Sequence, residues 1–183
     1  MKDKNVKLCH ANIALIGFMG AGKTTIGRLL SDKTGMLCID SDEEIEKITK
    51  IPIPAIFQIY GDGYFRRLEQ EFCNKIVPIL KNTVISTGGG IVLNKKNIDM
   101  LRLHSNVFYL KSSPQKLYSR LKDDTSRPVL QTDDKLEAIK KLLADREPFY
   151  ESCAHHVVDT DELDSSEIVK TILTVCSRDT TTE

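Results

Sequence analysis

The chain has 183 residues, of which 40% are hydrophobic and 28% charged, and its formal net charge is zero. This length suits one domain with one core, and the composition is that of an ordinary globular protein rather than a disordered chain. A neutral chain lacks the surplus of basic residues that draws a protein to nucleic acid or to an acidic membrane surface, so neither partner is predicted.

The five cysteines are widely scattered, and no two have the spacing of a zinc site or a C-x-x-C pair. We therefore predict reduced thiols in a cytoplasmic protein. Lys2, Lys4 and Lys7 precede an apolar run over residues 11–22 that resembles a secretory signal. That run is rich in glycine and no cleavage site follows it, so a strand entering a glycine-rich loop is the better interpretation.

Five short apolar runs predict five strands. They are residues 13–16, 36–39, 84–86, 107–110 and 156–158. Most are continuous rather than alternating, as expected for strands buried on both faces of a parallel sheet. Helical patterns separate them, and this alternation predicts a doubly wound α/β fold.

Several helices can be placed by their start and stop signals. Ser41 followed by Glu44 reads as a capping box, Pro54 fits a first turn, and residues 64–80 carry apolar side chains at helical spacing. The other predicted helices are 23–34, 95–103, 114–121, 135–149 and 165–176.

Two regions break this pattern of strands and helices. The polar segment 122–134 reads as a functional loop, because long irregular loops are uncommon in compact domains. The tail 177–183 is expected to be disordered. We therefore predict a single domain over residues 1–176.

Residues 17–24 read Gly-Phe-Met-Gly-Ala-Gly-Lys-Thr and match the phosphate-loop pattern G-x-x-x-x-G-K-[ST]. The loop lies between a predicted strand and a predicted helix, as the mechanism requires, because its backbone N–H groups then face phosphates at the positive end of the helix. Lys23 is expected to contact the β- and γ-phosphates, and Thr24 to bind Mg²⁺. The predicted nucleotide-binding residues of this loop are Gly20, Ala21, Gly22, Lys23, Thr24 and Thr25.

Other classes of phosphate-loop protein fit less well. A GTPase needs N-K-x-D, and the nearest string, Asn-Lys-Lys-Asn at residues 94–97, lacks the aspartate. Motor and AAA-type ATPases are normally larger than this chain. A compact nucleotide-dependent phosphotransferase remains.

Residues 17–28, Gly-Phe-Met-Gly-Ala-Gly-Lys-Thr-Thr-Ile-Gly-Arg, resemble the opening of shikimate kinases. Further segments resemble that family's motifs in the same order, and the resemblance spans about residues 11–175. These segments are Asp-Ser-Asp at 40–42, Phe-Arg-Arg-Leu-Glu at 65–69, Gly-Gly-Gly at 88–90, Arg-Pro-Val-Leu at 127–130 and Arg-Glu-Pro-Phe-Tyr at 146–150.

This resemblance implies a three-layer α/β/α fold with a five-stranded parallel sheet in the order 2-3-1-4-5. It implies a substrate-binding segment at about 41–80 and a mobile lid at about 122–134. The implied reaction transfers the γ-phosphoryl group of ATP to the 3-hydroxyl of shikimate, with Mg²⁺ required, giving shikimate 3-phosphate and ADP. The enzyme is expected to act as a monomer in the cytoplasm.

The resemblance also implies roles for residues near the acceptor. Asp40 faces Mg²⁺ through water, while Asp42 binds shikimate hydroxyls and is the candidate base. Arg66 and Arg146 bind the shikimate carboxylate, and Glu69 holds Arg66 and reaches substrate hydroxyls. From the residues alone, Asp42 could instead help to start a helix, and Arg66 with Glu69 could be an exposed ion pair.

The remaining implied roles concern the glycine turn and the nucleotide. Gly88, Gly89 and Gly90 let the backbone approach the substrate closely. Arg127 in the lid contacts the γ-phosphate and acts in catalysis with Asp42 and Lys23, while Arg120 stacks on adenine. Asp159 and Thr160 are expected to border the adenine pocket.

The chain departs from the family pattern at two places, and two other functions stay open. Gly61 is followed by Asp62 where the family often has glutamate, and the lid lacks glycine. A related small kinase such as a gluconate kinase could use the same arginine pair. A nucleotide-sensing protein without catalysis is the other alternative, but it would need neither Asp42 nor Arg127.

Overall fold

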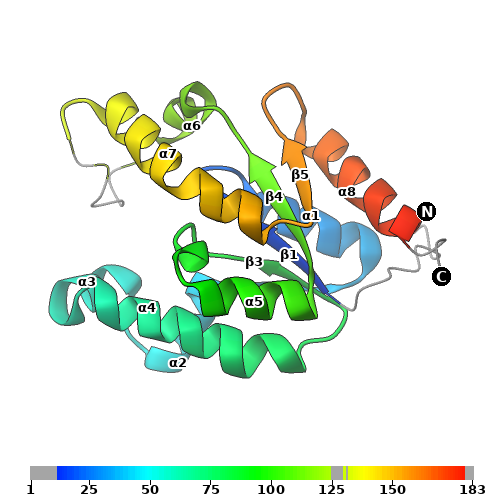
Figure 1. Cartoon of the computed structure of the whole chain (residues 1–183), viewed down its shortest axis with the longest axis horizontal. Helices are drawn as coiled ribbons and strands as arrows, with labels where there is room; N and C mark the ends of the chain where they lie inside the picture. The colour runs from blue at the N-terminus through cyan, green and yellow to red at the C-terminus, as the bar shows by residue number, and fades with distance from the viewer. Residues whose placement is uncertain (1–11, 125–129, 131, 180–183) are drawn as a thin grey trace.

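Five strands form one parallel sheet in the order β2-β3-β1-β4-β5 (Figure 1), as the resemblance implied. They are β1 (Asn12–Ile16), β2 (Leu37–Asp40), β3 (Thr83–Ser86), β4 (Asn106–Lys111) and β5 (His156–Asp159). Every residue of β1 and β3 is buried, whereas the edge strands β2 and β5 are partly exposed. The computed structural model describes residues 12–124, 130 and 132–179.

Helices cover both faces of the sheet and give three layers (Figure 1). On one face α1 (Lys23–Thr34) packs against α8 (Ser165–Asp179), and on the other α5 (Lys95–His104) packs against α7 (Lys135–Cys153). The short α6 (Pro114–Leu121) packs beside α7. The main core lies between these layers, with Leu15, Ile85 and Phe108 fully buried in it.

Three further helices, α2 (Ser41–Thr49), α3 (Ile53–Tyr60) and α4 (Asp62–Glu71), pack against one another beside the sheet. They have a small apolar core of their own, formed by Ile45, Ile56 and Phe65. These helices make up most of the segment 41–80 that was assigned to the substrate. The second residue of α3 is Pro54, so its predicted first-turn position is confirmed.

The predicted capping box at Ser41 was wrong. The residue that caps α2 is Asp40, whose Oδ1 accepts a hydrogen bond from the backbone N–H of Asp42 at 3.0 Å. The Ser41 hydroxyl is used elsewhere, because its Oγ accepts a hydrogen bond from the backbone N–H of Gly88 at 2.8 Å. The serine thus joins α2 to the loop that follows β3.

The predicted helix over residues 64–80 was also wrong at both ends. The α-helix begins at Asp62 and ends at Glu71, and a π-helical turn (Phe72–Ile76) and a 3₁₀ turn (Val77–Ile79) follow it. Pro78 explains part of this change, since proline has no backbone N–H for a helical hydrogen bond.

The two C-terminal helices are longer than the sequence indicated. Helix α7 continues through Pro148 to Cys153, and α8 continues to Asp179. Residues 177–179 of the expected disordered tail are therefore helical, and residues 180–183 lie outside the described residues. The hydroxyl of Ser177 donates to the Leu173 carbonyl one turn earlier at 2.7 Å.

Two further features of the described residues concern the cysteines and the apolar character of the helices. No disulfide joins Cys38, Cys73, Cys153 or Cys176 within the described residues, and Cys9 lies outside them. Within the described part of the chain, no helix is both long enough and apolar enough to cross a membrane.

Candidate active site

The loop between β1 and α1 has the conformation that its glycines predict. Gly20 and Gly22 have φ angles of 79° and 95°, a left-handed geometry that residues with a side chain rarely adopt. Lys23 is buried, and its Nζ donates to the carbonyls of Gly17 and Phe18 at 2.8 Å each. The ammonium group is therefore held within the loop that would surround the phosphates.

A cavity of about 580 Å³ opens beside this loop. The predicted nucleotide-binding residues Gly20, Ala21, Gly22, Lys23, Thr24, Thr25 and Arg120 all line it. Arg120 Nη1 also donates to the carbonyl of Gly20 at 2.9 Å, which fixes the guanidinium against the loop. This cavity is the candidate nucleotide site.

The assignment of Asp159 and Thr160 to the border of the adenine pocket stays a prediction. Asp159 and Thr160 are not among the described residues that line the nucleotide cavity. Thr160 is buried, and its hydroxyl donates to the Lys111 carbonyl at 2.9 Å. The cavity is lined instead by Ser165 and Ile168 at the start of α8, which no sequence motif marked.

Three side-chain oxygens meet at the carboxyl ends of adjacent strands. Thr24 Oγ1 donates to Asp40 Oδ2 at 2.9 Å and lies 3.3 Å from Ser86 Oγ. Asp40 pairs with Ser86 in the strand register, so their side chains end adjacent strands beside Thr24. Among the described residues no cluster of three His, Cys, Asp or Glu side chains could hold a metal. This sparse set of oxygens suits Mg²⁺, which keeps several waters and needs only one or two carboxylates.

A second cavity, of about 240 Å³, adjoins the first and is the candidate acceptor site. Met19, Asp42, Gly88 and Gly89 line both cavities, so a phosphate donor and an acceptor would meet there. The remaining lining residues are Ile53, Pro54, Phe57, Asp62, Phe65, Arg66, Glu69, Gly90 and Arg146.

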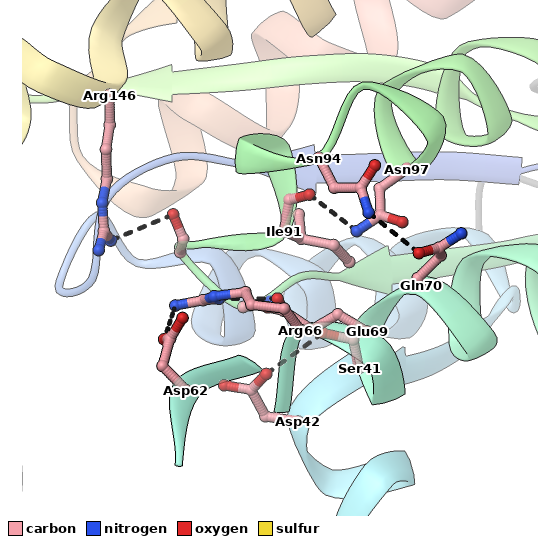
Figure 2. A network of polar contacts seen from close by, with 12 residues as sticks. Ser41, Asp42, Asp62, Arg66, Glu69, Gln70, Ile91, Asn94, Asn97 and Arg146 are labelled. Carbon is pink, nitrogen blue, oxygen red and sulfur yellow. Dashed lines mark hydrogen bonds and ion pairs between the residues drawn. The ribbon is translucent and has the colours of Figure 1, made fainter. Parts of the chain in front are cut away.

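Arg66 lies between two carboxylates of its own helix (Figure 2). Its Nη1 donates to Glu69 Oε2 at 2.7 Å, and its Nη2 donates to Asp62 Oδ1 at 3.0 Å. Burial lowers the pKa of Arg66, but the charges and hydrogen bonds of Glu69 and Asp62 outweigh it, so its pKa is raised. The guanidinium therefore stays cationic.

Glu69 is not part of an exposed ion pair, since its side chain is only 1% exposed. Its Oε1 is buried without a hydrogen-bond partner in the described structure. Burial raises the pKa of Glu69 to about 7, against the lowering effect of Arg66 and with smaller upward contributions from Asp42 and Asp62. A buried oxygen of this kind is well suited to accept a hydrogen bond from a ligand hydroxyl.

This raised pKa predicts a particular dependence of stability on pH. Between pH 4.5 and 7 the folded chain holds a proton on Glu69 that the unfolded chain has released. The free energy of unfolding contributed by the protonated Glu69 is therefore lost as pH rises from about 4.5 to 7. Relative to Glu69→Gln, the wild-type free energy of unfolding should fall by up to about 3 kcal/mol across this window and then level off. Urea titrations of both proteins at several pH values test this, and parallel profiles would show that Glu69 ionises normally.

The three glycines of residues 88–90 are needed for space. None of them has a positive φ. A Cβ on Gly88 would lie 2.5 Å from Asp42 Oδ1, and one on Gly90 would collide with the guanidinium of Arg66. The glycines thus make room for the functional side chains, in addition to any approach of the backbone to a ligand.

Helix α7 contributes Arg146 and Tyr150 to this turn. The Tyr150 hydroxyl donates to the Gly89 carbonyl at 2.5 Å, and Arg146 Nη1 approaches the same oxygen at 3.5 Å. Arg146 is nearly buried, and it enters the acceptor cavity from the side opposite to Arg66 (Figure 2). The sequence contained Tyr150 in a motif but gave no role for it.

Part of the predicted lid can be described, but its arginine cannot. Arg127 lies outside the described residues, so its assignment to the γ-phosphate stays a prediction. Lys135 Nζ donates to the carbonyls of Leu121, Lys122 and Asp124, which ties the two flanks of the segment together. Leu130 is buried in the main core.

Comparisons with known proteins identify the family of this chain. Residues 19–177 match the family model described as shikimate kinase. A shikimate kinase from Caldicellulosiruptor saccharolyticus is 42% identical over 164 residues, which cover 90% of this chain and 94% of that protein.

The solved structures include a shikimate kinase from Acinetobacter baumannii in complex with shikimate. It aligns with a TM-score of 0.88 and 34% identity, over 93% of this chain and 95% of that one. A gluconokinase from Sinorhizobium meliloti aligns with a TM-score of 0.57 and 20% identity, over 92% of each chain. The similarity to the gluconokinase is one of fold alone.

Proposed function

The chain belongs to the shikimate kinase family, an ATP-dependent phosphotransferase family, and we propose how its residues transfer the γ-phosphoryl group of ATP to the 3-hydroxyl of shikimate. The observation that carries this proposal is the junction of two cavities at Asp42, Gly88 and Gly89. The larger cavity borders the phosphate loop, and the smaller contains two guanidinium groups that can bind a carboxylate.

The nucleotide binds in the larger cavity. Its phosphates contact the loop N–H groups at the N-terminus of α1, where the helix dipole favours negative charge. Lys23 Nζ then exchanges the carbonyls of Gly17 and Phe18 for phosphate oxygens. Arg120, which lines this cavity, is assigned to the adenine ring.

We assign Mg²⁺ to the oxygens of Thr24 and Asp40, with Thr24 as a direct ligand and Asp40 acting through water. The 2.9 Å contact between the two side chains supports this assignment. When bound, the ion neutralises charge on the phosphates during transfer.

The acceptor binds in the smaller cavity with its carboxylate between Arg66 and Arg146. A guanidinium binds a carboxylate through two parallel hydrogen bonds, which fixes the orientation of the ring. Glu69 Oε1 then accepts a hydrogen bond from a ring hydroxyl, which satisfies an oxygen that is otherwise buried without a partner.

Asp42 acts as the general base, since it lines both cavities. Its carboxylate accepts the proton of the 3-hydroxyl as that oxygen bonds to the γ-phosphorus. The bond from the γ-phosphorus to the bridging oxygen breaks, and ADP leaves with the bonding electrons. Arg127 is assigned to the transferring phosphoryl group, where an arginine stabilises charge in the transition state.

A coupled assay of ADP release tests this function with shikimate, quinate, gluconate and nucleoside monophosphates as acceptors. Shikimate should give the highest kcat/KM, because its ring hydroxyls and carboxylate match the groups in the smaller cavity. A preference for gluconate would favour the related sugar-acid kinases. ATP binding without ADP release from any acceptor would favour a nucleotide-sensing protein.

The monomeric state and the cytoplasmic location stay predictions from the sequence. Size-exclusion chromatography with light scattering measures the first, with a mass near 20.6 kDa expected for a monomer.

A further inference from the structure

Arg66 has a second carboxylate partner that differs from the first in its surroundings. Glu69 is buried, whereas the Asp62 side chain is 64% exposed and lies where the acceptor cavity meets solvent. Both residues belong to α4, and Figure 2 shows Asp62 on the Nη2 side of the guanidinium. A solvent-exposed carboxylate thus contacts the group that would bind the acceptor.

Asp62 is not needed to keep Arg66 in place. The bond to buried Glu69 at 2.7 Å fixes Nη1, and the guanidinium also packs against Gly90. An exposed ion pair with an i,i+4 spacing contributes little to stability. Asp62 therefore affects ligand binding mainly through its negative charge.

That charge disfavours an anionic ligand. The described lining of the cavity carries the carboxylates of Asp42, Asp62 and Glu69 but the guanidiniums of only Arg66 and Arg146. An acceptor carboxylate at Arg66 would lie close to Asp62, and both would compete for Nη2.

We propose that Asp62 is a specificity-determining residue that competes with the acceptor carboxylate for Arg66 and thereby weakens acceptor binding. This inference rests on the proposed function, because it requires a carboxylate acceptor in the smaller cavity. Asp62 holds Nη2 in the empty site and swings into solvent when the acceptor takes its place. The competition keeps the acceptor affinity low and its release fast.

The test is Asp62→Asn, which removes the charge and keeps the size of the side chain. The KM for shikimate should fall about fivefold, as expected from the loss of one solvated charge at contact distance, while the KM for ATP stays the same. The methyl ester of shikimate, which lacks the negative charge, should show no such fall. The difference in shikimate KM between wild type and Asp62→Asn should also shrink at high salt, because exposed charges are screened.

Two variants serve as controls. Glu71→Gln removes the same charge from the exposed end of the same helix, where Glu71 pairs with Lys75 outside the acceptor cavity, and should leave the KM unaltered. Asp62→Glu restores the charge and should return the KM toward the wild-type value. Melting temperatures of all three variants exclude a general loss of structure.

The outcomes separate this inference from the proposed function. A rise in the shikimate KM of Asp62→Asn would mean that Asp62 positions Arg66, and an equal fall for the ester would exclude charge competition; either result overturns the inference. Calorimetric titration with shikimate compares the affinities of wild type and Asp62→Asn without turnover. Wild-type protein that neither binds nor phosphorylates shikimate would instead refute the proposed function.

Discussion

Asp42→Asn is expected to bind ATP nearly as well as wild type and to lose about 10²–10⁴-fold in kcat, the usual contribution of a general base. The amide keeps the size of the carboxylate but cannot take a proton from the attacking hydroxyl. Its place in the first turn of α2 adds a small loss of helix stability, because a negative charge there favours the helix dipole. That loss is too small to account for a hundredfold effect.

Glu44→Gln is the matched control for Asp42. It removes a charge from the same turn of α2, but Glu44 pairs with Lys47 and lines neither cavity. Steady-state kinetics and ATP titration of both variants separate base catalysis from helix stability. A wild-type kcat in Asp42→Asn would remove Asp42 from the mechanism.

Arg66→Ala is expected to weaken shikimate binding by about 10²-fold while the affinity for ATP changes little. The estimate follows from the loss of hydrogen bonds between charged groups, at about 1.5–3 kcal/mol each. The substitution also leaves Glu69 buried without its cation, so the pKa of Glu69 should rise further and the carboxyl should become protonated. The two substrates are affected differently because Arg66 lines only the smaller cavity.

Arg67→Ala is the matched control for Arg66. Arg67 is the next residue of α4, but it is exposed, and its guanidinium packs over the ring of Tyr64. Separate calorimetric titrations with shikimate and ATP show whether Arg66→Ala weakens the binding of shikimate alone. Equal weakening of both ligands in Arg66→Ala would assign Arg66 to the fold or to the phosphates.

The sequence predicted the sheet and the strand–loop–helix of the phosphate loop, for a physical reason. Strands buried on both faces have to be apolar throughout, and a phosphate loop needs glycine and lysine at fixed spacing. Both signals are local, so the strand positions and the residues around Lys23 could be identified from neighbours in the chain. The sheet order came from the resemblance, because strand count alone does not determine it.

The features that were predicted wrongly or missed depend on contacts between segments that are distant in the sequence. Ser41 looked like a helix cap, but its hydroxyl binds Gly88, 47 residues away. Tyr150 reaches Gly89 from a separate helix, and the start of α8 enters the nucleotide cavity, neither of which a local pattern records. Asp62 was visible only as a departure from the family motif, and its proposed role rests on its contact with Arg66.

The position of the phosphoryl group in the product tests the central claim most directly. The protein is incubated with ATP, Mg²⁺ and shikimate, and the product is analysed by phosphorus–proton correlation NMR. We expect a single phosphate ester whose phosphorus couples to the proton on carbon 3 of the shikimate ring. An ester at another hydroxyl, or no shikimate ester at all, would contradict the proposed arrangement of Asp42 between the two cavities.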